Sequence, residues 1–109
     1  MRTTETGEAP ACELCGRRGA PLTRHHLIPR TRHRDARVRR RYSRAELAQR
    51  VAWLCRACHK QVHAVLDEKT LARDYDSVDK LRAHPELARF IRWIRRRPPG
   101  YVPVTRRRR

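Results

Sequence analysis

Four cysteines and four histidines of this 109-residue chain occur in pairs whose spacing suits the binding of metal ions. The cysteines form two Cys-x-x-Cys motifs, and the histidines form one adjacent pair and one pair four residues apart. These side chains are Cys12, Cys15, Cys55, Cys58, His25, His26, His59 and His63. Thiolates and imidazoles are common ligands of Zn²⁺ and related ions. The pattern therefore predicts metal binding.

The two Cys-x-x-Cys motifs predict one shared structural site. The N-terminal stretch, MRTTETGEAP, is polar and lacks the apolar core of a secretory signal, so we expect a cytoplasmic chain with reduced thiols. Four thiolates from Cys12, Cys15, Cys55 and Cys58 then give a tetrahedral Zn²⁺ site that is closed to substrate. Such a site contributes on the order of 10 kcal/mol to folding. A redox motif or unliganded core cysteines are the alternatives.

The histidines are expected on two elements. Residues 22–28, LTRHHLI, are bounded by prolines and predict a short strand that carries His25 and His26. Residues 56–66 predict a helix, on which His59 and His63 lie one turn apart on the same face. Consecutive strand residues point to opposite faces, so His25 and His26 address one site only where the strand twists or ends.

The order of the motifs, CxxC, then HHLIPR, then LCxxCHxxxH, resembles the HNH endonucleases with the ββα-metal fold. The resemblance covers residues 12–63. It implies a metal-dependent endonuclease that hydrolyses phosphodiester bonds of DNA. It also implies that His25, His59 and His63 hold a catalytic divalent ion, which is Mg²⁺, Mn²⁺, Ni²⁺ or Zn²⁺. His26 would be the general base that activates water.

The chain departs from the HNH pattern in one respect. The family carries an Asn shortly before the second Cys-x-x-Cys motif, whereas this chain contains no Asn. Gln49 and Arg50 are the candidates for its loop-bracing role. The chemistry of the remaining residues suits the implied reaction, because an imidazole with a pKa near ~6.5 accepts a proton at neutral pH. A divalent ion with open coordination positions compensates phosphate charge and stabilises the leaving oxygen.

The charge of the chain predicts a nucleic-acid partner, which we expect to be double-stranded DNA. Lys and Arg number 28 against 11 Asp and Glu, and the formal net charge is +17. Eight of the arginines fall between residues 30 and 44, in a stretch without an apolar face that predicts a phosphate-contacting loop. The candidate contacts are Arg30, Arg32, Arg34, Arg37, Arg39, Arg40 and Arg41, of which Arg30 or Arg32 could steady the phosphate beside the base. No stretch approaches the ~20 apolar residues of a membrane span.

These elements predict a small α+β fold, with a ββα-metal core, a four-cysteine zinc site and C-terminal helices. Ser43 and Glu46 match a capping box that opens a helix to about residue 50. Residues 51–54 predict the second strand of a hairpin, and residues 68–75 and 78–83 predict helices, the second capped by Asp76 or Ser77. Pro85 opens a last helix with an apolar stripe at Leu87, Phe90, Ile91 and Ile94.

We expect residues 1–10 to be a disordered lead-in and residues 98–109 a disordered basic tail. Residues 11–97 form a single domain, with zinc knuckles and metal core at 11–66 and a helical extension at 67–97.

Two other interpretations use the same residues. One is a zinc-stapled nucleic-acid-binding module without catalysis. The other pairs the ligands locally in two zinc sites, with Cys12 and Cys15 joined by His25 or His26, and with Cys55 and Cys58 joined by His63.

Overall fold

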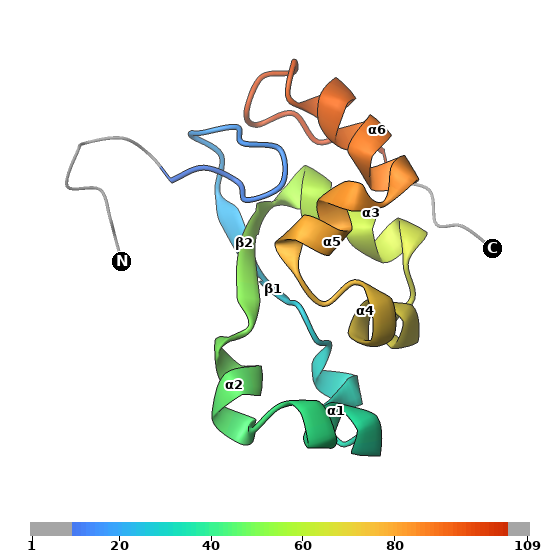
Figure 1. Cartoon of the computed structure of the whole chain (residues 1–109). Helices are drawn as coiled ribbons and strands as arrows, with labels where there is room; N and C mark the ends of the chain where they lie inside the picture. Colours follow the sequence, from blue (N-terminus) through green and yellow to red (C-terminus); the bar gives the residue numbers. More distant parts are fainter. Residues whose placement is uncertain (1–9, 105–109) are drawn as a thin grey trace.

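A two-stranded antiparallel hairpin lies at the centre of the structure, a computed structural model that describes residues 10–104 (Figure 1). Strand β1 (Leu22–His26) pairs with β2 (Val51–Cys55). In this register Leu22 lies opposite Cys55 and His26 opposite Val51. The predicted hairpin is therefore confirmed, and with it the α+β class.

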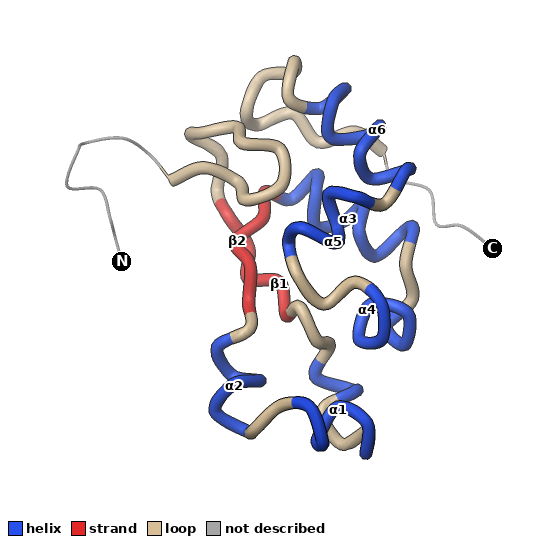
Figure 2. The backbone as a smooth tube through the Cα atoms, viewed as in Figure 1, coloured by secondary structure: helices blue, strands red, loops and turns tan. Residues whose placement is uncertain are grey.

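Helices follow and interrupt this hairpin, as Figure 2 shows in blue around the red strands. The segment between the strands carries the short 3₁₀ helix η2 and the helices α1 and α2. The chain continues after β2 through α3 to α6. The bounds are η2 (Arg30–Arg32), α1 (Ala36–Arg41), α2 (Arg44–Gln49), α3 (Arg56–Val65), α4 (Glu68–Asp74), α5 (Val78–Ala83) and α6 (Pro85–Ile94). None of the described helices is both long and apolar enough to cross a membrane.

Local signals fix the helix starts. Ser43 caps α2, with its side chain accepting from the Glu46 amide while the Glu46 carboxylate accepts from the Ser43 amide. This is the predicted capping box. Ser77, not Asp76, caps α5 by accepting from the Lys80 amide. The helix α6 begins with Pro85 at its first position, where a missing N–H costs nothing.

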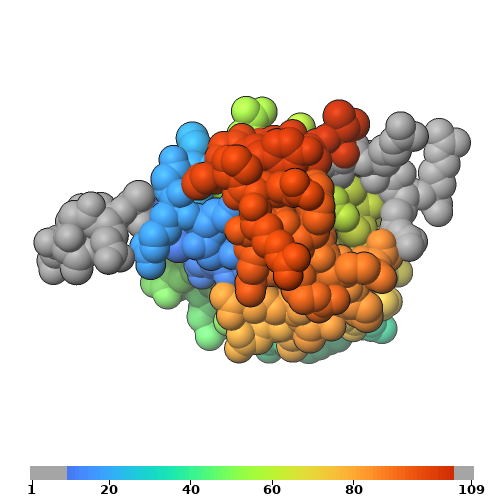
Figure 3. All heavy atoms as spheres, turned by 90° about the horizontal axis from the view of Figure 1, so that it is seen from above, coloured from blue at the N-terminus to red at the C-terminus, as the bar shows by residue number. Residues whose placement is uncertain are grey.

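The main core lies between the hairpin, α3 and the C-terminal helices. Leu87, Ile91 and Ile94 of α6 are buried, while Phe90 is only partly buried beside them. They pack in one cluster with residues of β2, α3, α4 and α5, namely Leu54, Val62, Leu71 and Leu81. Figure 3 shows α6 and the chain after it (orange to red) lying over the top of the molecule. The predicted apolar stripe therefore packs in the core.

The structure differs from the predicted basic loop at residues 30–44. Most of this segment is helical, in η2 and α1. Asp35 caps α1 by accepting from the Arg37 amide, and Val38 is buried in a small second cluster with Ile28 and Leu47. One cap and one apolar anchor suffice for a helix of six residues, which a search for a periodic apolar face does not detect.

The start of the predicted tail contacts α6. The amide of Tyr101 donates to the carbonyl of Pro98 (2.9 Å), and the Tyr101 ring lies against Trp93 of α6. Pro98 and Tyr101 also accept hydrogen bonds from Arg17, so the segment from Pro98 to Tyr101 contacts the domain. Residues 1–9 of the predicted lead-in and residues 105–109 of the predicted tail lie outside the described residues.

Candidate metal centres

The four cysteines meet in one place, which we call the cysteine cluster (Cys12, Cys15, Cys55 and Cys58). All four are buried and free of disulfides, and their sulfur atoms lie within 4.8 Å of one another. The Sγ atoms of Cys15 and Cys55 are 3.8 Å apart. A tetrahedron with Zn–S bonds of about 2.3 Å has edges of about 3.8 Å. The cluster therefore fits a four-thiolate structural metal site such as zinc.

Backbone geometry prepares the first half of this cluster in the N-terminal turn (residues 11–18), which a bridge between Ala11 and Arg18 closes. The amides of Leu14 and Cys15 point at Cys12 Sγ, at 3.4 and 3.5 Å. Gly16 takes a φ of 81°, a left-handed conformation that favours glycine. These N–H groups stabilise negative charge on sulfur, as a metal-bound thiolate requires.

Arg17 compensates charge at the same cluster. Its side chain is buried, donating from Nε to Cys15 Sγ (3.4 Å) and from Nη2 to Cys55 Sγ (3.3 Å). Its third nitrogen, Nη1, donates to the carbonyls of Pro98 (2.6 Å) and Tyr101 (3.3 Å). Hydrogen bonding, chiefly with Cys12, lowers the pKa of Cys15 to about 6 and also lowers that of Cys55. The sequence analysis did not identify this role, because two of the partners of Arg17 lie 81 and 84 positions away in the chain.

The second group is the histidine cluster (His25, His59 and His63). His25 comes from β1 and the other two from one face of α3. Their ring centroids are 5.1 to 5.3 Å apart, and their candidate ligand nitrogens lie within 4.8 Å of one another. The structure thus brings together the three side chains that the sequence predicts as ligands of the catalytic ion.

The surroundings of His25 fit those of a metal ligand. The residue is completely buried, and neither ring nitrogen has a hydrogen-bond partner among the described residues. Buried polar atoms without partners are rare and cost on the order of 1–3 kcal/mol each. Burial, together with the neighbouring His59 and His63, lowers the pKa of His25 to about 3. The imidazole is therefore neutral at pH 7, which is the form that binds a metal ion.

A hydrogen bond to Thr23 holds the His59 ring at its Nδ1 atom. Its Nδ1 lies 2.7 Å from the hydroxyl of Thr23, and that hydroxyl donates to the carbonyl of Leu54 (2.9 Å). Burial and then the nearby His63 lower the pKa of His59 as well. The described surroundings of His25 and His59 thus favour neutral imidazoles at both residues.

His26 is the last residue of β1 and lines a groove of about 810 Å³. We call it the arginine groove, and its walls are Arg24, His26, Arg30, His33, Arg34, Arg39, Tyr42, Ser43, Arg44, Leu47 and Ala48. Burial and then Arg24 and Arg30 lower the pKa of His26, so the ring is neutral at pH 7. The charge of His26 in turn affects the pKa of both His25 and His59. Its position at the strand end therefore joins the groove to the histidine cluster.

Six of the seven arginines predicted to contact nucleic acid divide between two faces. Arg30, Arg34 and Arg39 line the arginine groove. Arg32, Arg37 and Arg41 line a smaller hollow of about 130 Å³ beside α4, and Arg40 is exposed and lines neither. Two of the second set are in ion pairs, Arg32 with Asp35 and Arg41 with Asp76.

Sequence reasoning missed two arginines of the groove. Arg24 shares a strand face with His26, because residues two apart in a strand point the same way. This alternation was the signal that could have found it. Arg44 enters from the start of α2, and no local signal distinguishes it from the arginines around it.

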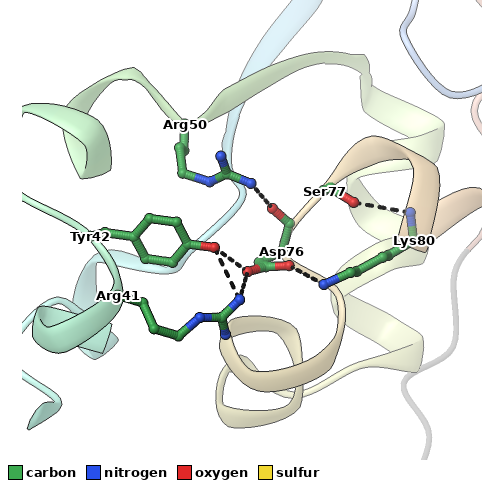
Figure 4. A network of polar contacts seen from close by, with 6 residues as sticks. All are labelled: Arg41, Tyr42, Arg50, Asp76, Ser77 and Lys80. Atoms are coloured by element: carbon green, nitrogen blue, oxygen red, sulfur yellow. Dashed lines mark hydrogen bonds and ion pairs between the residues drawn. The ribbon is translucent and has the colours of Figure 1, made fainter. Parts of the chain in front are cut away.

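Asp76 is the centre of a polar network that includes Tyr42, a residue of the groove wall (Figure 4). Its buried carboxylate accepts from the hydroxyl of Tyr42 and from Lys80 Nζ (2.9 Å), and Arg41 lies 3.3 Å away. Burial raises the pKa of Asp76, but the hydrogen bonds from Tyr42 and Lys80 outweigh it, and the net shift is downward. The carboxylate is therefore ionised at neutral pH and fixes Tyr42 in the groove wall.

Arg50, rather than the exposed Gln49, braces the loop between the strands. Its Nη2 donates to the backbone carbonyl of Asp76 (3.0 Å), and its guanidinium lies 4.9 Å from the centre of the Tyr42 ring. The carbonyl of Arg50 also accepts from the Leu27 amide (3.0 Å) just beyond β1. These contacts close the hairpin loop just before β2.

The arrangement also separates the two kinds of ligand. Cys12 and Cys15 meet Cys55 and Cys58, whereas the histidines form their own group. Local pairing of cysteines with histidines, as in two finger-like sites, is therefore not the arrangement that this structure adopts.

Comparison with known proteins finds a relative of similar length. The chain is 38% identical over 99 residues to the uncharacterised protein YisB of Bacillus subtilis (strain 168), across 91% of this chain and 87% of the relative. No family model matches the chain, and no solved structure matches it significantly.

Proposed function

The chain belongs to the same protein family as YisB of Bacillus subtilis, and we propose that it is a metal-dependent endonuclease of the HNH type. In this proposal the hairpin and α3 form the ββα-metal core, and the substrate is double-stranded DNA. The histidine cluster holds the catalytic divalent ion, and the cysteine cluster holds a structural Zn²⁺.

One observation carries the proposal. A buried His25 with two unpartnered nitrogens faces His59 and His63, and His26 next to it opens into a groove with five arginines. A metal site alone is compatible with many functions, and an arginine groove alone with any nucleic-acid binder. Their junction at adjacent residues of one strand supports hydrolysis of a phosphodiester.

Each group of side chains has its own role in the proposed hydrolysis. Arginines of the groove bind the phosphodiester backbone through guanidinium forks, which match phosphate geometry. His26 is neutral because its pKa is lowered, and it accepts the proton of the attacking water. A divalent ion, once bound by three neutral histidines, supplies charge compensation for the phosphate and the leaving oxygen.

The test is cleavage of supercoiled plasmid DNA with Mg²⁺, Mn²⁺, Ni²⁺ or Zn²⁺ added separately. We expect the wild type to nick or cut with at least one of these ions, and His26→Ala to lose about 10²–10⁴-fold in rate. His84→Asn is the matched control, because His84 caps α6 far from the groove and Asn keeps a capping acceptor. Undiminished cleavage by His26→Ala would remove this residue from the role of base.

A second function, a nucleic-acid-binding module without catalysis, is favoured by the absence of Asn from the chain. The cysteine cluster would then staple a fold that binds phosphate through the groove. Binding of DNA without cleavage by any of the four ions would support this module and contradict the nuclease.

A further inference from the structure

We infer that Thr23 is a positioning residue that fixes the tautomer of His59 and aims its Nε2 at the ion of the histidine cluster. This inference deepens the proposed function, since it depends on that cluster binding a metal. Thr23 belongs to β1 and lies opposite Leu54 of β2.

The hydrogen bonds of Thr23 leave one arrangement of protons. The hydroxyl lies 2.9 Å from the carbonyl oxygen of Leu54 and 2.7 Å from Nδ1 of His59. A carbonyl oxygen only accepts, so the single hydroxyl proton of Thr23 is donated to Leu54. The Thr23 oxygen then accepts from His59, and Nδ1 must carry a proton.

This proton decides which nitrogen of His59 binds the ion. A neutral imidazole, which is the form that binds a metal ion, has one N–H and one lone pair on its two ring nitrogens. With the proton on Nδ1, the lone pair is on Nε2. Metal-ligating histidines are commonly oriented by a hydrogen bond of this kind at the other ring nitrogen, and losing it typically costs 10- to 100-fold in metal affinity.

The same contact links the two metal centres. Leu54 directly precedes Cys55, and Cys58 directly precedes His59. Thr23 therefore connects the backbone carbonyl next to Cys55 with the imidazole ring next to Cys58. The position of the cysteine cluster therefore affects the Leu54 carbonyl, which orients the Thr23 hydroxyl and, through it, the His59 ring.

Two substitutions test the hydroxyl itself. Thr23→Val keeps the size and the β-branch that suit a strand but removes the hydroxyl. Thr23→Ser keeps the hydroxyl and is the matched control. The full chain, with Zn²⁺ supplied to the cysteine cluster, is titrated with Co²⁺ or Ni²⁺ by calorimetry, beside His59→Ala as the reference for a lost ligand. Thermal unfolding of each variant verifies that it is folded.

We expect Thr23→Val to weaken Co²⁺ or Ni²⁺ binding by about 10- to 100-fold and Thr23→Ser to stay close to the wild type. Long-range ¹⁵N–¹H NMR before the titration should give the Nδ1–H tautomer of His59 in the wild type and Thr23→Ser. Thr23→Val should lose that preference.

A wild-type His59 protonated on Nε2, or a folded Thr23→Val that binds the ion as tightly as the wild type, would overturn the inference. Failure of the nuclease proposal gives a different result. In that case the tautomer and the Co²⁺ or Ni²⁺ affinities follow the expected order, while no plasmid is cleaved.

Discussion

The cysteine cluster and the histidine cluster share the hairpin and α3 but differ in how their ligands are surrounded. Backbone amides and Arg17 already donate to the sulfur atoms, whereas His25 has no partner on either nitrogen among the described residues. The first cluster is built for a fixed negative charge, and the second is built of neutral rings. The two clusters therefore differ in the donors around them as well as in the ligands themselves.

The number of ligands separates the clusters further. Four thiolates complete a tetrahedron and leave no position for substrate, whereas three histidines leave positions open. In our proposal the open positions matter because His26, the residue that follows His25, lines the arginine groove. The difference between four and three ligands is therefore the difference between holding the fold and, in our proposal, acting on DNA.

The largest expected effect is the loss of a cysteine ligand. Cys55→Ser should unfold the domain, because a structural zinc site contributes on the order of 10 kcal/mol and a small domain has about 5–15 kcal/mol in total. Far-UV circular dichroism and zinc content per chain measure the outcome. A cooperative unfolding transition near that of the wild type would contradict a structural role for the cysteine cluster.

His63→Ala should give the opposite result. The domain should stay folded, with a change in unfolding free energy of about 1 kcal/mol. Plasmid cleavage should fall by roughly 100-fold or more, because an ion that polarises phosphate is worth several kcal/mol. Thermal unfolding and the cleavage assay are run on one preparation, and an unfolded His63→Ala would mean that both clusters are structural.

Arg17→Met tests the charge compensation at the cysteine cluster. Removing donors from two sulfur atoms and two carbonyls should lower the free energy of unfolding by about 1–3 kcal/mol. Urea unfolding measures the change, and the exposed Arg40→Met is the control, expected to lie within about 0.5 kcal/mol of the wild type. Equal effects of the two substitutions would show that the sulfur contacts of Arg17 do not stabilise the fold.

The smallest effect concerns the groove. Arg24→Ala should weaken DNA binding and reduce the slope of log affinity against log salt by about 1, because one phosphate contact is lost. Arg37→Ala, on the face beside α4, should leave the slope unchanged. Fluorescence anisotropy at several salt concentrations distinguishes them. A larger slope change for Arg37 would place the nucleic-acid surface on the other face.

Local patterns in the sequence predicted much of the fold. Ser43 with Glu46, Pro85, and the stripe beginning at Leu87 each act within one or two turns, so their structure follows from neighbouring residues. The cysteine cluster was predictable for another reason, because paired thiols in a reduced chain have few uses other than metal binding.

Long-range polar contacts were not predictable. Asp76 meets Tyr42 and Arg41 across more than 30 positions of the chain, and Arg17 meets Pro98 across 81. No spacing rule connects such residues, because their encounter depends on how the helices pack. The division of the arginines between two faces was not predictable for the same reason. It depends on the helix α1, which Asp35 caps and Val38 anchors.

The ligands on α3 set a constraint on length. Each residue of an α-helix advances the side-chain direction by about 100°, so the adjacent Cys58 and His59 point toward different clusters while His63 returns to the direction of His59. One residue inserted between Cys58 and His59 would turn both histidines away from His25 together and leave the cysteines in place. The angular phase of this helix therefore limits insertions more strictly than it limits substitutions at its exposed positions.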